Sequence, residues 1–204
     1  MSGRFEPVQR LAVLGLGLLG GSVAWAARER GLAREVVGCG RRSEPLERMV
    51  ADVEGAGGKA EFEAMDIRDD EAVDKLMDGV LERHGRIDLL VNNAGGQFLS
   101  PAEAISPKGF RTVIELNVQG TWQMTHAAAT KAFIPQKQGK VVSITVSPHQ
   151  SFPGMVHAGA ARAAVEGGPP DTTSFAPPDT AGEVPDGTTP RQRRRIAVPP
   201  GDHS

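Results

Sequence analysis

The chain has 204 residues, enough for one domain of ordinary size, and its 23 basic and 25 acidic residues are interspersed and give a formal net charge of −2. This balance leaves no basic face for neutralising phosphates, so the sequence does not favour nucleic-acid binding. The single cysteine, Cys39, excludes an internal disulfide and a cysteine-rich zinc site, which favours a reducing compartment and predicts a cytoplasmic protein.

The beginning of the chain predicts a strand, a turn and a helix. Residues 11–16 are a short apolar run that breaks at glycine, and residues 18–30 have the composition of a helix that ends at Gly31. The apolar stretch 11–27 also resembles a secretory signal. We favour a nucleotide-binding turn and no membrane segment, because a signal or membrane helix poorly accommodates Gly15, Gly17, Gly20 and Gly21.

The same alternation of strands and helices continues along the chain. Further strands are predicted at 35–39, 60–65, 87–91 and 141–146, and helices at 44–53, 69–84 and 109–133. Such strands pair in parallel through right-handed crossovers. The sequence therefore predicts an α/β fold, a Rossmann-type doubly wound parallel sheet of about five strands within residues 1–166.

The composition changes at Gly167. Residues 167–204 contain eight prolines and five glycines, few large apolar residues and no periodicity. Such a segment buries too little apolar surface to offset the entropy lost on ordering. We expect a disordered Pro/Gly-rich tail.

A glycine motif lies between the first predicted strand and its helix. Gly15, Gly17 and Gly20 match the pattern GxGxxG, in which they allow a tight turn, close approach of the pyrophosphate and close packing of helix and strand. The helix N-terminus attracts the phosphates. The motif predicts binding of a nicotinamide dinucleotide, and a glycine-rich turn without a ligand is the alternative.

The end of the second predicted strand bears on the choice of cofactor. An acidic residue at this place binds the ribose hydroxyls of NAD, whereas arginine accommodates the 2′-phosphate of NADP. Here the strand is followed by Arg41 and Arg42, with no acid directly after it. NADP(H) is favoured, while NAD(H), or two arginines on a loop without a ligand, remain alternatives.

Two family resemblances follow from these motifs. Residues 8–42 resemble the amino-terminal segment of prephenate dehydrogenases. Residues 38–166 resemble the short-chain dehydrogenase/reductase family. The matching motifs are an Asp-Ile pair, an Asn-Asn-Ala-Gly turn and LNVQGT in the long helix. This second resemblance implies that Asp66 and the backbone of Ile67 hold the adenine and that Asn117 supports a proton-relay water. The same resemblance implies that the turn residues Asn93, Ala94 and Gly95 lie beside the cofactor.

Within that family, NNAGGQFLSPAEAISPKGF and MVHAGAARAAVE are similar to the 2,4-dienoyl-CoA and trans-2-enoyl-CoA reductases. The chain has no tyrosine, and Ala158 stands where the usual catalytic tyrosine would be. The lysine and aspartate of dienoyl-CoA reductases correspond to Arg162 and Glu166. The resemblance implies that the small-molecule substrate is an acyl-CoA thioester. It also implies that Arg162 binds either the nicotinamide ribose or the thioester oxygen.

The reduction needs a group that donates a proton and a group that hydrogen-bonds the substrate carbonyl. Arginine stays protonated, so the proton must come from Glu166 or a bound water, and Thr145 or Ser147 would hydrogen-bond the carbonyl. His149 and His157 are not spaced as a metal pair, and we interpret them as a loop residue and a helix-start residue. No metal site is predicted.

The two resemblances overlap at residues 38–42, which predicts a chimera with its junction there. The second one ends at Glu166, before the later strands of the family, so we expect a truncated fold whose tail is a frameshift product, with an unpaired edge at the fifth strand. In the family the helix at 109–133 helps to form a dimer, which implies a homo-oligomer. The alternatives to an acyl-CoA reductase are a noncatalytic nucleotide-binding fragment and a prephenate dehydrogenase-like oxidoreductase.

Overall fold

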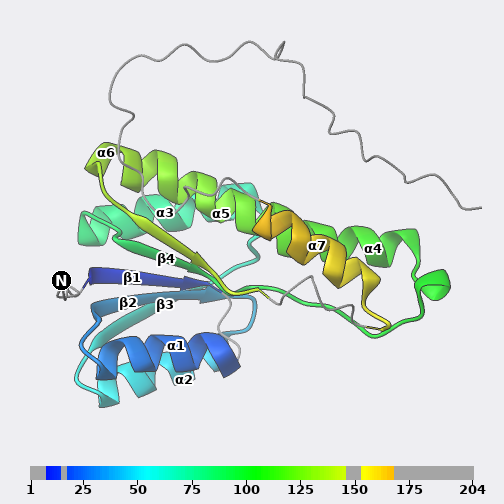
Figure 1. Cartoon of the computed structure of the whole chain (residues 1–204). Coiled ribbons are helices and arrows are strands. Elements are labelled where there is room, and N and C mark those ends of the chain that lie inside the picture. Colours follow the sequence, from blue (N-terminus) through cyan, green and yellow to red (C-terminus); the bar gives the residue numbers. More distant parts are fainter. Residues whose placement is uncertain (1–7, 15–17, 146–152, 168–204) are drawn as a thin grey trace, which may run out of the picture.

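The computed structural model describes residues 8–14, 18–145 and 153–167 of the chain. Its centre is a five-stranded parallel sheet with the strand order β3-β2-β1-β4-β5 (Figure 1). The order reverses direction beside β1, which is the mark of a doubly wound sheet. The strands are β1 (Val8–Leu14), β2 (Ala33–Gly40), β3 (Lys59–Ala64), β4 (Leu89–Asn92) and β5 (Lys140–Ser143).

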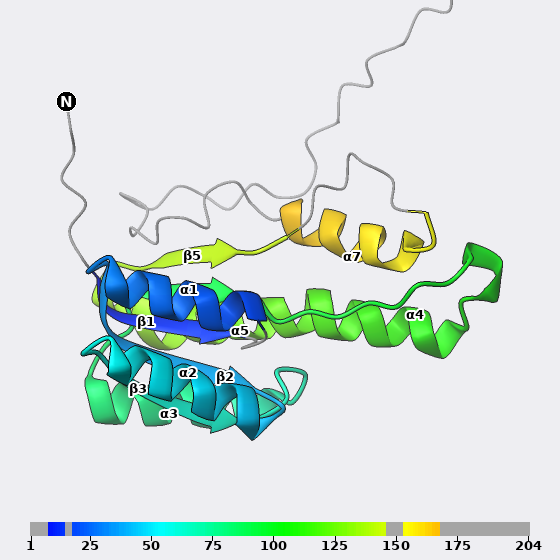
Figure 2. The same ribbon diagram turned by 90° about the horizontal axis from the view of Figure 1, so that it is seen from below.

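Helices cover both faces of the sheet. One face carries α1 (Leu18–Glu29) and α2 (Ser43–Gly55), and the other carries α3 (Asp70–His84) and a long helical run (Figure 1). That run consists of α4 (Pro107–Ile114), η2 (Glu115–Gln119), α5 (Gly120–Ala128), η3 (Ala129–Phe133) and α6 (Ile134–Gln136). A short turn, η1 (Ala102–Ala104), precedes it, and α7 (Val156–Glu166) lies beyond the carboxyl end of β5 (Figure 2).

The second strand shows why the sheet is covered on both faces. Val36 packs with Ala24 and Leu46 beneath α1 and α2, while the next residue, Val37, packs with Met77 on the α3 side. Successive side chains of a strand point to opposite faces, so a strand buried on both faces is apolar at neighbouring positions. The predicted α/β class and the parallel sheet of five strands are confirmed.

Helix ends follow local chemistry. Asp69 begins α3 by accepting a hydrogen bond from the Ala72 amide at 3.1 Å, and Gly85 ends it in the left-handed conformation with φ 74°. Ser106 begins α4 by accepting a hydrogen bond from the Gly109 amide at 3.0 Å. These caps satisfy backbone groups that a helix end leaves unpaired.

The bounds of the predicted strands differ from the structure. The first three strands begin earlier than predicted, at Val8, Ala33 and Lys59. The strand predicted at 87–91 begins only at Leu89, because the side-chain amide of Gln136 takes both backbone groups of Ile87, at 3.1 and 2.7 Å. The strand predicted at 141–146 is Lys140–Ser143, and it pairs with β4 alone in the described part of the chain. The expected unpaired edge is therefore present in that part.

The remaining expectations about organisation have different outcomes. Within the apolar stretch 11–27, residues 11–14 end β1 and residues 18–27 form most of α1, in agreement with the strand and helix predicted there. Within the described ranges, no helix is long and apolar enough to cross a bilayer. The tail from 168 onward lies outside the described residues, and the junction predicted at 38–42 falls where β2 ends and α2 begins.

Candidate functional site

The carboxyl ends of the strands meet at one edge of the sheet, where open α/β folds bind their ligands. Of the glycine motif, Gly20 is buried within the first turn of α1, and Gly15 and Gly17 lie outside the described residues. At the end of β4, Asn93 and Ala94 are half-buried, and Ala94 packs against the core. The predicted cofactor residues thus follow neighbouring strands of one edge.

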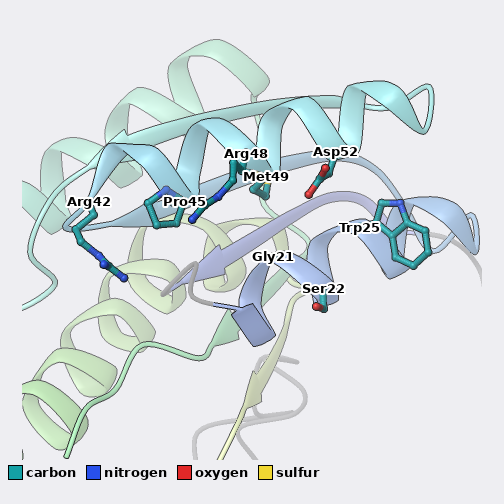
Figure 3. Close-up of a pocket in the computed structure, with 8 residues that line it drawn as sticks. All are labelled: Gly21, Ser22, Trp25, Arg42, Pro45, Arg48, Met49 and Asp52. Atoms are coloured by element: carbon teal, nitrogen blue, oxygen red, sulfur yellow. The ribbon is translucent and has the colours of Figure 1, made fainter.

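Arg41 and Arg42 are exposed directly after β2. Arg42 precedes α2 in an extended conformation and lies at one end of a cleft of about 570 Å³ between α1 and α2, which Trp25, Arg48 and Asp52 also line (Figure 3). Arg48 is paired with Glu44 at 2.9 Å, whereas neither Arg41 nor Arg42 has a carboxylate partner among the described residues. Both arginines can therefore receive an anionic group.

Asp66 follows β3 and is held by Arg68. The guanidinium lies 2.5 Å from the carboxylate at its nearest approach, and the Arg68 amide donates a further bond of 3.1 Å. These bonds, together with the positive charge of Arg41, hold the pKa of Asp66 below its ordinary value. With Glu115 and Gln119, the pair lines a hollow of about 400 Å³ at this edge.

Ile67 is buried, unlike Asp66. Its side chain is 4% exposed and lies against Gly120, where an added Cβ would approach Ile67 Cδ1 to 2.6 Å. Glycine at 120 therefore lets the long helix pack closely on this side chain. The side chain of Ile67 belongs to the core, and the adenine contact of its backbone stays a prediction.

Asn117 binds the turn that follows β4. Its side chain is 1% exposed, its Nδ2 donates to the carbonyls of Gly96 and Val113 at 2.8 Å each, and its Oδ1 accepts a bond from the Gly96 amide at 3.3 Å. Every polar group of the side chain is used in this way. Asn117 therefore fixes the Gly95–Gly96 turn, and its predicted support of a relay water stays a prediction.

A ladder of threonines explains how Asn117 is held, and the sequence reasoning missed it. Asn117 lies in η2, a π-helical turn, and its carbonyl accepts a bond from the Thr121 hydroxyl at 2.9 Å. Thr125 donates to the Thr121 carbonyl at 2.8 Å and accepts from Nδ2 of Asn92 at 2.9 Å. The signal in the sequence was the spacing of four residues, which puts these side chains on one face of the helix.

Arg162 of α7 reaches the same turn. An added Cβ at Gly95 would lie 2.5 Å from the guanidinium of Arg162 and 2.7 Å from Oδ1 of Asn117, so the three residues converge. Arg162 also donates to the Ile144 carbonyl at 3.1 Å, directly after β5. No carboxylate pairs with it in the described part of the chain, and burial lowers its pKa. The site therefore holds a partly buried, uncompensated positive charge.

The other predicted catalytic residues, Thr145 and Glu166, differ in exposure and in their distance along the chain from the Arg162 contacts. Thr145 is half-buried after β5, close in sequence to the carbonyl that Arg162 binds. Glu166 is exposed at the end of α7 and forms no hydrogen bond or ion pair with other described residues. Ser147 and His149 lie outside the described residues. The structure brings Asn117 and Arg162 together but not Glu166.

His157 is the second residue of α7, in agreement with its interpretation as a helix-start residue. It is 0% exposed, and neither ring nitrogen has a hydrogen-bond partner within the described ranges. Its ring lies 4.4 Å from the ring of Phe98, which is 42% exposed on the loop after β4. Sequence reasoning gave no sign of this burial, because it depends on packing between distant segments.

The sequence is similar to known oxidoreductases. The family model described as short chain dehydrogenase matches residues 17–168, which include α1 and β2. A probable 2,4-dienoyl-CoA reductase of Bacillus subtilis is 34% identical over 144 residues, covering 70% of this chain and 56% of that protein. A peroxisomal 2,4-dienoyl-CoA reductase of Arabidopsis thaliana is 33% identical over 135 residues, covering 62% and 45%. The chain spans about half the length of these relatives.

The fold is similar to solved structures as well. A citronellol catabolism dehydrogenase of Pseudomonas aeruginosa has a TM-score of 0.72 at 33% identity, covering 81% of this chain and 69% of that one. A metagenomic short-chain oxidoreductase in complex with NADP has a TM-score of 0.72 at 28% identity, covering 78% and 72%.

Proposed function

Since the chain belongs to the short chain dehydrogenase family, we propose that it binds NADP(H) at the carboxyl edge of its sheet and reduces an unsaturated acyl thioester. The observation that carries this proposal is the convergence of Gly95, Asn117 and Arg162 on one turn beside β4 and β5. The similarity to 2,4-dienoyl-CoA reductases supports the choice of substrate class.

The residues after β2 fit a 2′-phosphate. Arg41 and Arg42 are exposed, and neither forms a direct ion pair with a carboxylate of the described residues. Arg41 also acts electrostatically on Asp66, so the ends of β2 and β3 lie near one another. Two guanidinium groups on one loop form charge-assisted bonds to phosphate, which favours NADP(H) over NAD(H).

When bound, the nicotinamide supplies the hydride that reduces the acyl group. The guanidinium of Arg162 stabilises negative charge that develops on the thioester oxygen, or binds the nicotinamide ribose, and Thr145 donates to the same oxygen. Asn117 holds the Gly95–Gly96 turn in place for these contacts. Because arginine does not release its proton and the structure does not bring the exposed Glu166 to this turn, a water molecule protonates the carbon that carries negative charge after hydride transfer.

Nucleotide titration tests the cofactor. Wild type is titrated with NADPH and NADH, following nucleotide fluorescence and thermal melting, since a ligand that binds the native state raises its Tm. The double variant Arg41→Ala/Arg42→Ala should lose about tenfold in NADPH affinity, which corresponds to about 1.4 kcal/mol, and little in NADH affinity. Arg48→Ala is the matched control, because Arg48 lines the same cleft but is paired with Glu44. Equal losses for both nucleotides contradict the 2′-phosphate assignment.

Reduction is measured separately. Enoyl-CoA and dienoyl-CoA thioesters are added with NADPH, and oxidation of the nucleotide is followed by absorbance. Binding without turnover favours the second candidate, a noncatalytic nucleotide-binding protein. This alternative is supported by Arg162 at the place of the dienoyl-CoA reductase lysine, since arginine does not release its proton, and by the exposed position of Glu166. Turnover of prephenate with NADP would instead favour the prephenate dehydrogenase-like alternative. That resemblance and the chimeric junction stay predictions.

We also propose that two copies pair through the long helix. Trp122 of α5 is 61% exposed and stacks on His126 with ring centroids 4.8 Å apart, which leaves a large aromatic surface uncovered. Trp122→Ser should weaken self-association in sedimentation experiments. The cytoplasmic location also stays a prediction, and five of the similar proteins are described as peroxisomal.

A further inference from the structure

Large apolar side chains are exposed together at the end of the molecule away from the strands. Leu99 is 75% exposed, Val156 54%, Phe98 42% and Phe110 39%. We call these four residues the distal apolar surface. They come from the loop after β4, from α4 and from α7, whose beginnings lie on the same side in Figure 2. Exposed apolar groups that gather in this way commonly mark a binding surface.

Contacts join the three segments that carry this surface. The Ser100 amide donates to the Gly154 carbonyl at 2.9 Å, and a Cβ at Gly154 would lie 3.7 Å from Cδ2 of Leu99. Phe98 lies against α4, since a Cβ at Gly109 would lie 3.0 Å from its Cζ. The loop therefore connects the beginning of α4 to the beginning of α7.

The distal apolar surface leads to the polar site. Arg162 lies six positions after Val156 along α7, and Asn117 lies seven positions after Phe110 along the long helix. At about 1.5 Å per residue, both paths are roughly 10 Å long. Gly95, at the polar end, precedes Phe98 and Leu99 by a few residues of the same loop. All three segments thus connect the region of the Arg162 guanidinium, which has no carboxylate partner among the described residues, to the distal apolar surface.

This arrangement fits an amphipathic ligand with an oxygen at one end and a hydrocarbon at the other. We propose that the distal apolar surface binds the acyl chain of the thioester substrate, with the carbonyl end at Arg162. The inference rests on the proposed function for the identity of that ligand. It adds that affinity depends on chain length, because each methylene laid on the surface removes apolar area from water.

The test is isothermal titration of the full chain with coenzyme A and with its butanoyl, octanoyl and dodecanoyl thioesters, with and without NADPH. Affinity should rise from butanoyl to octanoyl by about twofold per methylene, half the free-energy effect of complete burial. Leu99→Ser should reduce this rise severalfold. Ile134→Ser is the matched control, because Ile134 is 57% exposed in α6, at the opposite end of the long helix (Figure 1).

The outcomes separate this inference from the proposed function. Equal affinity for all chain lengths, or equal effects of the two variants, overturns the inference even if NADPH binds. A chain-length dependence that Leu99→Ser removes supports it even if NADPH does not bind, in which case the cofactor proposal fails alone. If Leu99→Ser instead dissociates a dimer in sedimentation and leaves the chain-length dependence unchanged, the surface joins two copies of the chain, and the inference is wrong.

Discussion

Replacement of Asn117 by alanine should destabilise the fold and weaken nucleotide binding together. The side chain forms hydrogen bonds of 2.8, 2.8 and 3.3 Å with backbone groups of Gly96 and Val113; the bond to Val113 is buried and the two to Gly96 are partly buried. At about 0.5–1.5 kcal/mol for each bond, we expect a loss of roughly 2–4 kcal/mol. This is a large part of a total stability of about 5–15 kcal/mol.

The assay is urea unfolding with a parallel thermal melt, in which a loss of this size lowers Tm by roughly 5–15 °C. NADPH affinity is measured at a temperature where the variant is folded, and it should fall because the Gly95–Gly96 turn is no longer fixed. The control is Thr112→Ala, which removes an exposed bond of 3.0 Å to the Lys108 carbonyl on the same long helix and should cost less than about 0.5 kcal/mol. Equal stability of the two variants would refute the assignment of Asn117 to positioning.

Three further outcomes are expected. Gly139→Ala should lower the free energy of unfolding in urea by about 1–3 kcal/mol, because the new Cβ would overlap the ring of Phe133, which is 0% exposed. Its control is Gly159→Ala in α7, where the new Cβ has open space and should raise that free energy by up to about 1 kcal/mol. Similar effects of the two variants would contradict the packing argument. Burial alone raises the pKa of Glu61, but hydrogen bonds from Arg83 and His84 outweigh it and hold this pKa below its ordinary value. Its stabilising contribution is therefore complete at neutral pH and is lost as the pH falls below about 4.5, so urea midpoints should fall less on acidification in Glu61→Gln than in wild type. Arg162→Gln should lower NADPH or thioester affinity by about tenfold to a hundredfold and Arg162→Lys by less, and unchanged titrations in both variants would remove Arg162 from the site.

The order and type of the elements could be predicted because they depend on local patterns. Apolar runs of strand length, helical periodicity and glycine breaks occur at the right places, and their alternation restricts the topology to a parallel sheet with helices on both faces. The helix predicted at 109–133 lies within the observed run from Pro107 to Gln136. Its two π-helical turns, η2 and η3, were not predicted.

The ends of elements depended on contacts that the sequence does not reveal. Ile87 was placed in a strand because it is apolar and β-branched, yet the side-chain amide of Gln136, 49 residues away, binds its backbone first. The predicted site shows the same limit. Asn117 was identified from its sequence motif, but its bonds to Gly96 become visible only when the long helix packs beside β4.

The sequence by itself determined the α/β class, the parallel sheet and the edge at which the candidate site lies, because strand ends of a doubly wound sheet fall at predictable places. Only the tertiary structure decided that Arg162 meets the Gly95–Gly96 turn, that Glu166 stays exposed and that His157 is buried against Phe98. These facts depend on how α7 packs against α4 and η2. Local propensities define each helix, whereas the packing between helices is fixed by side chains distant in the sequence.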